Sequence, residues 1–122
     1  MLKYYLEQIN KINVNSTNSE INKILKKNLN WKGSLDLRDT SITFLPKGLK
    51  VGGFLNLYNT KITSLPKGLK VGGSLDLSNT KITSLPSDLK VGGNLNLNNT
   101  GFKGGFRFAK IRPKGVKGEI II

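Results

Sequence analysis

Two aspartates occupy the same position in different copies of a sequence repeat. Asp36 and Asp76 each lie in a segment that alternates apolar and polar residues. If the copies stack as parallel strands, two strand spacings place these residues about 9 to 10 Å apart. This separation overlaps that of the two carboxyl groups in inverting glycosidases. A sheet of four strands offers no deep cleft and no apolar pocket that would keep one carboxyl protonated, so we predict no catalytic residues and no enzyme.

Lysine recurs in two rows at other positions of the repeat. The first row is Lys50, Lys70 and Lys90, with Lys110 twenty residues further on, and the second row is Lys47 and Lys67. Ammonium groups stacked about 4.8 Å apart repel one another by less than about 1 kcal/mol per pair in water, before screening by salt. An anionic partner would make such a row favourable, and a phosphate backbone could follow it. The alternative is a solvated face that only aids solubility.

The last part of the chain combines cations with aromatic rings. Residues 101–122 contain six basic residues and one acidic residue, a net charge of +5. The predicted binding residues here are Lys103, Phe106, Arg107, Phe108, Lys110 and Arg112. Surfaces that bind single-stranded nucleic acids use cations for phosphates and rings for base stacking. Alternatively, the rings cover the open end of a sheet and the cations keep its edge from pairing with other chains.

A third candidate site lies on the alternating segments themselves. Phe54 and Tyr58 share one segment and point to the same side of a predicted strand, and Arg38 is the counterpart of Tyr58 in the preceding copy. Aromatic and arginine side chains together are typical of a small protein-binding hot spot. An exposed aromatic pair is equally common on ordinary surfaces.

The composition excludes most enzyme classes. The chain has 122 residues, a formal net charge of +13, and neither histidine nor cysteine. One domain is expected for this length. Without imidazole or thiol groups there is no disulfide, no thiolate nucleophile and no common zinc site. The sequence shows no secretory signal pattern and no apolar run of membrane-spanning length. We therefore predict a cytoplasmic protein with no membrane attachment, metal, cofactor or small-molecule substrate.

The aspartates, the lysine rows and the aromatic pair, but not the residues after 100, are positioned by a repeat of 20 residues. Its copies are 33–52, 53–72 and 73–92, with a partial fourth copy from residue 93. The shared template is G-x-L-x-L-x-x-T-x-I-x-x-L-P-x-x-L-x-V-G. Stacking the copies as coils of a solenoid buries each apolar residue on its own counterpart. Six continuous apolar columns are predicted, which begin at Leu35, Leu37, Ile42, Leu45, Leu49 and Val51.

The template also predicts the local structure of each coil. The segments 34–38, 54–58, 74–78 and 94–98 are predicted to be short strands of one parallel sheet. The glycine pair before each segment supplies a permissive backbone for a corner. The prolines favour an extended return segment over a helix, and they are Pro46, Pro66 and Pro86.

The run L-x-L-x-x-T-x-I-x-x-L-P-x-x-L resembles a leucine-rich repeat of the short bacterial type, from Trp31 to Thr100. The resemblance implies an α/β-type solenoid, a right-handed coil with a short parallel β-sheet, and protein binding through the strand face. The family usually carries asparagine where this chain has Thr40, Thr60 and Thr80, and a threonine hydroxyl can also bond the turn backbone. The Val-Gly-Gly corner departs from the family pattern and leaves a β-solenoid cross-section open.

The segments that flank the repeats are predicted to close the solenoid. Two stretches before the repeats have helical spacing, and Thr17 with Glu20 forms a capping-box pattern at the start of the second, which runs to Leu29. We predict an N-terminal helical cap over 1–32, repeats over 33–100, and a basic C-terminal cap or tail over 101–122 with a strand or hairpin. All three form one folded domain.

Two functional hypotheses follow. The first is a non-enzymatic binding module whose basic surface engages an acidic macromolecule: a nucleic acid, a nucleoprotein complex or an acidic protein surface. The second is a protein–protein adaptor or inhibitor that binds through the strand face, with the charge serving solubility and association rate. By analogy, a small lysine- and asparagine-rich repeat protein also suits a phage or mobile element that blocks a host defence complex. The sequence leaves the oligomeric state open.

Overall fold

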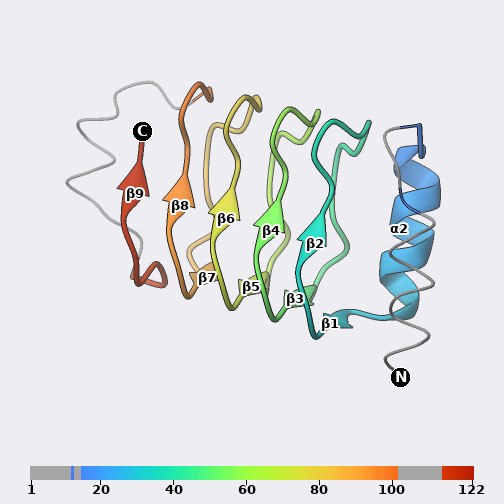
Figure 1. Ribbon diagram of the computed structural model, residues 1–122, viewed down its shortest axis with the longest axis horizontal. Coiled ribbons are helices and arrows are strands. Elements are labelled where there is room, and N and C mark those ends of the chain that lie inside the picture. The colour runs from blue at the N-terminus through green and yellow to red at the C-terminus, as the bar shows by residue number, and fades with distance from the viewer. Residues whose placement is uncertain (1–11, 13–14, 102–113) are drawn as a thin grey trace.

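Each coil of the chain stacks on the one before it, so that residues twenty apart pair as parallel strands. The computed structural model describes residues 12, 15–101 and 114–122, which form a parallel-strand β-solenoid of about three turns with one short helix (Figure 1). The helix, α2, spans Asn18–Lys27. Figure 1 shows α2 beside β2 at one end of the row of coils and β9 at the other end.

The strands form two parallel sheets. One sheet has the order β1 (Asn30–Trp31), β3 (Lys50–Val51), β5 (Lys70–Val71) and β7 (Lys90–Val91). The other has the order β2 (Leu35–Asp36), β4 (Leu55–Asn56), β6 (Leu75–Asp76), β8 (Leu95–Asn96) and β9 (Ile120–Ile121). We call them the lysine sheet and the strand-face sheet. The glycine corner separates them in every coil.

The predicted parallel sheet of the alternating segments is confirmed, but the second sheet was not predicted. The strand-face sheet lies where the alternating segments predicted it, although each of its strands is only two residues long. The lysine sheet was missed because a Lys-Val pair has no run of alternation to reveal it. Stacked extended backbones pair wherever they meet, and the strict period brings Lys50 onto Lys70 and Val51 onto Val71.

The predicted apolar columns form the core. In the first coil, all six predicted residues are buried, and their counterparts in the following coils continue the same cluster. In the column that begins at Leu45, Leu85 is only partly buried and packs against the cluster. This agreement confirms that the chain buries its apolar residues by stacking copies rather than by pairing a helix with a sheet.

The corner glycines are required by close backbone contact. A Cβ on Gly72 would overlap the carbonyl oxygen of Gly52, and a Cβ on Gly92 would overlap that of Gly72. Left-handed backbone is instead taken by Asp39, Asn59, Asn79 and Asn99, with φ between 54° and 60°. The expected role of the glycine pair in permitting unusual dihedrals is thus replaced by a steric role.

Two polar rows hold the turn after each strand of the strand-face sheet. The threonine hydroxyls donate to a carbonyl three residues back, as between Thr60 Oγ1 and Leu57 O at 2.9 Å, which is the turn bond expected of threonine. The ladder between coils is made by the preceding residue. Asn79 Nδ2 donates to Asn59 Oδ1 at 2.8 Å, and Asn99 Nδ2 donates to Asn79 Oδ1 at 2.6 Å.

Helix α2 begins with the predicted capping box. Glu20 N donates to Thr17 Oγ1 at 3.1 Å, and Thr17 N donates to Glu20 Oε1 at 3.3 Å. Ile21 and Leu25 are buried in the same cluster as the coil residues. The helix ends at Lys27, two residues short of Leu29, which is exposed. The first predicted helical stretch lies outside the described residues apart from Ile12.

The final coil breaks the period. Leu95 pairs with Ile120, a separation of 25 residues, whereas 20 residues separate Leu75 from Leu95. Val91 likewise forms a parallel bridge with Val116. The strand β9 is parallel to its neighbour, which rules out an antiparallel hairpin between β8 and β9. The predicted strand or hairpin over 101–112 otherwise falls outside the described residues.

We expect Gly72→Ala to lower the free energy of unfolding by about 1 to 3 kcal/mol, the usual range for an overpacked site. The added methyl group has no space between two backbones that already touch. The measurement is denaturant unfolding followed by the fluorescence of the buried Trp31. Ser84→Ala, at an exposed position of the next copy, should change stability by less than about 0.5 kcal/mol. Equal stability of the two variants would contradict this contact.

Candidate functional site

The first predicted lysine row lies on the lysine sheet. Lys50 pairs with Lys70, and Lys70 pairs with Lys90, on adjacent parallel strands. All three side chains are exposed, whereas the valine that follows each is buried. Because parallel strands are about 4.8 Å apart, the row places one ammonium group per strand along the axis of the solenoid. This confirms the predicted stacking of like charges on one face.

The final coil places two lysines, Lys114 and Lys117, beside the end of this row. Val91 N donates to Gly115 O at 2.8 Å, and Lys117 N donates to Val91 O at 3.0 Å. Gly115 therefore takes the position next to Lys90, where a spacing of twenty residues had placed Lys110. Lys117 takes the position next to Gly92. Lys110 itself lies outside the described residues, so the predicted fourth member of the row is replaced by the 114–117 segment.

The result is a groove over the end of the lysine sheet. We call it the lysine groove, and its lining residues are Lys70, Val71, Gly72, Lys90, Val91, Gly92, Lys114, Gly115 and Lys117. Four of these are lysines and none is acidic. Within the described residues, the ion pair found is Arg38 Nε with Asp36 Oδ2 at 3.2 Å, far along the chain from the groove. The groove is thus a concentrated positive charge without a described counter-ion.

The second predicted row stacks as well. Gly48 N donates to Lys67 O at 3.1 Å, which places the Lys47 and Lys67 turns on each other. Both side chains are exposed. In the next copy Asp88 accepts a hydrogen bond from Gly68 N at 2.9 Å, so this row loses its positive character there. The basic surface of the second row is limited to the first two copies.

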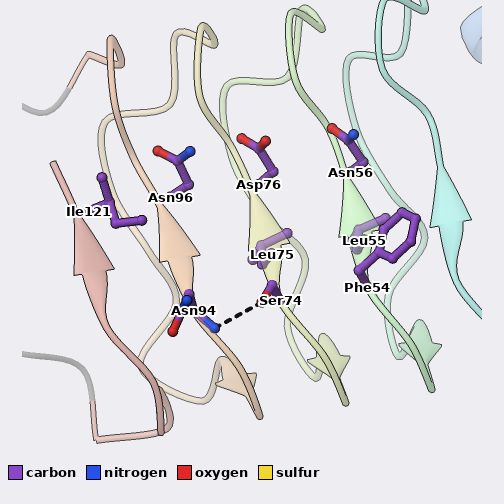
Figure 2. Close-up of a pocket in the computed structure, with 9 residues that line it drawn as sticks. All are labelled: Phe54, Leu55, Asn56, Ser74, Leu75, Asp76, Asn94, Asn96 and Ile121. Atoms are coloured by element: carbon purple, nitrogen blue, oxygen red, sulfur yellow. Dashed lines mark hydrogen bonds between the residues drawn. The ribbon is translucent and has the colours of Figure 1, made fainter.

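The aromatic candidate site lies on the strand-face sheet. Phe54 and Tyr58 flank β4 and are 46% and 42% exposed. Arg38 is exposed in the preceding coil, where Asp39 N donates to Tyr58 O at 3.0 Å. Figure 2 shows Phe54 and Ile121 on opposite sides of a shallow groove, with Asn56 on the Phe54 side and Asp76 and Asn96 on the strands between. The structure therefore brings the predicted protein-binding residues together on one face.

The paired aspartates have structural partners. Asp36 Oδ1 accepts from Arg38 N at 3.2 Å, and Asp76 Oδ1 accepts from Ser78 N at 2.9 Å. Asn56 and Asn96, the counterparts of these aspartates in the other two copies, also accept from the amide two residues on, as Asn56 Oδ1 does from Tyr58 N. This row needs an acceptor oxygen at each strand end, and either aspartate or asparagine supplies it. The pattern that suggested a carboxylate pair is explained by this local bond.

No metal cluster or bilayer-spanning element occurs in the part of the chain that the structure describes. No three acidic residues there lie close enough to hold an ion. None of the helices there is long and apolar enough to cross a membrane.

Comparison with known proteins gives no relative for this chain. No protein-family model, curated protein or solved structure matches it. The geometry of the two faces is therefore the basis for the function proposed below.

The six binding residues predicted in the C-terminal segment 101–122 lie outside the described residues. They are Lys103, Phe106, Arg107, Phe108, Lys110 and Arg112.

Sequence reasoning did not place Lys114 and Lys117 beside Lys90, although a signal was present. The stretch 114–122 places Val116, Gly118 and Ile120 where the copy before it has Val91, Gly93 and Leu95. The five extra residues in this coil hide the match from a search at a fixed period. A search for the short pattern V-x-G-x-L, with isoleucine allowed in place of leucine, would have found it.

We expect Asp76→Asn to leave the free energy of unfolding unchanged within about 0.5 kcal/mol. Asparagine keeps the oxygen that accepts from the Ser78 amide, as Asn96 does for Asn98 in the next copy. Asp76→Ala removes the acceptor of both the Ser78 amide and its hydroxyl, and should cost about 1 to 3 kcal/mol. Denaturant unfolding of the two variants distinguishes these outcomes. A loss of stability in Asp76→Asn would show that the negative charge itself matters.

Proposed function

We propose that this protein is a non-enzymatic binding module that engages nucleic acid, free or within a nucleoprotein complex, through the lysine sheet. The observation that carries the proposal is the row Lys50, Lys70 and Lys90 in strict strand register. The formal net charge of +13 supports it. The described carboxylates of the repeat have local structural partners, which supports a role in binding rather than catalysis.

In the free protein, the lysine row carries an unfavourable electrostatic energy. Like charges on adjacent strands repel, whereas the asparagines in the turns after the strand-face sheet satisfy one another by donating and accepting along the stack. A phosphate backbone neutralises the ammonium groups and releases condensed counter-ions, and this release drives association. The strand spacing of about 4.8 Å lets flexible lysine side chains reach successive phosphates. Such contacts carry no base specificity.

We also propose that the coil is a variant of the leucine-rich repeat, and that α2 and the 114–122 segment close its two ends. The support is the burial of Ile21 and Leu25 against the first coil and the pairing of β9 with β8. In this arrangement the ends are covered and the long faces are free for partners.

The test of the main proposal is a variant that carries Lys50→Gln, Lys70→Gln and Lys90→Gln. We expect its binding to a labelled 20-nucleotide single strand to be at least about tenfold weaker near 50 mM salt. The slope of log affinity against log salt should fall by about 2, because three phosphate contacts of about 0.7 each are lost. Fluorescence anisotropy over a salt series measures both quantities for RNA, single-stranded DNA and duplex DNA.

The matched control carries Lys23→Gln, Lys61→Gln and Lys81→Gln. These lysines are exposed and lie outside the lysine groove, and their loss changes the net charge equally. The control should keep most of the affinity and slope. Equal losses in both variants would indicate attraction by net charge alone and contradict a localised surface.

A second function is favoured by a separate observation. Phe54 and Tyr58 remain about half exposed on the strand-face sheet, with Arg38 beside them, although a stable monomer gains nothing from exposing two rings. We therefore keep a protein–protein adaptor or inhibitor as the alternative, with the charge serving association rate.

The alternative is tested by a Phe54→Ser and Tyr58→Ser double variant. If a protein partner is identified, this variant should weaken its binding by tenfold or more, about 1.4 kcal/mol, since aromatic anchors dominate interface energies. The measurement is titration calorimetry beside the lysine-row variant. An unchanged affinity in the double variant, with a loss in the lysine-row variant, would exclude the strand face as the contact surface.

A further inference from the structure

The lysine groove differs from the rest of the lysine row in its charge density. Along the row each strand contributes one lysine, as Lys50 does on β3. In the groove, Lys70 and Lys90 are joined by Lys114 and Lys117 from the final coil. Four lysines therefore line one groove over two strands and one bridge, and the described lining contains no carboxylate to balance them.

The groove also stands where the row stops. Gly115 occupies the place next to Lys90, so the final coil contributes no lysine to the row itself. Lys117 stands instead in the neighbouring outward position, which Gly72 and Gly92 leave without a side chain in the preceding coils. A polyanion bound along the lysine row would therefore reach the lysine groove at this end, and not a further lysine of the row.

An internal phosphodiester and a strand end differ in charge. Each internal phosphate carries one negative charge, whereas a terminal phosphate monoester carries about 1.5 to 2 negative charges at neutral pH. A monoester also presents three oxygen acceptors, which several ammonium donors can share. The charge of the groove matches the monoester better than it matches one phosphodiester.

Resting on the proposed function, we infer that the lysine groove binds the terminal phosphate of a single-stranded nucleic acid whose backbone follows the row from Lys90 toward Lys50. The protein then recognises phosphorylated strand ends in preference to strand interiors. Lys114 and Lys117 provide this preference, and the row provides general affinity.

The experiment compares three labelled single-stranded DNA probes. One is a 20-mer with hydroxyl groups at both ends, one is the same 20-mer with a 5′- or 3′-phosphate, and one is a 21-mer with hydroxyl ends, which adds a charge without a terminal phosphate. At about 0.1 M salt, we expect one end-phosphorylated 20-mer to bind about fivefold more tightly than the other two probes, the gain expected for about one further phosphate contact.

The decisive variant is Lys114→Gln with Lys117→Gln. We expect it to bind all three probes with equal affinity, and to lose no more affinity for the hydroxyl-ended 20-mer than about twofold. The matched control, Lys61→Gln with Lys81→Gln, removes two exposed lysines outside the groove and should keep the fivefold preference. Circular dichroism of each variant checks that the solenoid is intact.

The outcomes separate the inference from the function on which it rests. Equal affinity of the wild-type protein for all probes, or a preference that survives in the Lys114 and Lys117 variant, would overturn the terminal-phosphate site and leave nucleic-acid binding in place. Absence of binding to every probe would overturn both. Competition by a phosphoserine peptide at the same concentration as the phosphorylated 20-mer would show that the groove reads phosphate monoesters without nucleic acid, which would also overturn the inference.

Discussion

The stacking of each coil directly on its predecessor is the constraint on which the rest of the structure depends. It demands that the backbones touch at the corner, where a side chain on Gly72 would overlap Gly52. Once the coils are in register, every residue faces its own copy twenty positions away. Each position of the template must then hold a residue that interacts favourably with an identical residue in the next coil.

Different residue types meet this requirement in different ways. Leucine, isoleucine and valine gain by stacking, because each column excludes water along its length. Asparagine also gains, since one amide can donate to the copy below and accept from the copy above, as Asn79 does. Lysine does neither, because it has donors and a positive charge but no acceptor. The lysine row is therefore a polar row that stacking leaves unsatisfied, and this is the physical basis for proposing an anionic partner at this face.

The departure from the period concentrates this charge. A final coil of 25 residues instead of 20 shifts the template, so that a glycine falls in the lysine row and a lysine falls in the glycine position. The same shift lets Ile120 and Ile121 form β9 on the outer side of β8. At this end of the solenoid, β9 continues the strand-face sheet with apolar residues. On the lysine sheet, Gly115 and Lys117 exchange the usual positions of lysine and glycine.

The amino-acid sequence by itself determined the solenoid, its period, its apolar columns and the lysine row, because a repeat of fixed length fixes which residues share a column. It also determined the start of α2, since the capping box is a local pattern. Sequence reasoning missed the lysine sheet, because two-residue strands depend on contact between coils. It also misassigned the glycines and the end of the row. Only the tertiary structure decided that the backbone contact at Gly72 leaves no room for a side chain, that Asp76 serves its own turn, and that Lys117 lines the same groove as Lys90. These facts depend on which backbones lie against each other, and a pattern read along one chain does not contain that information when the spacing changes.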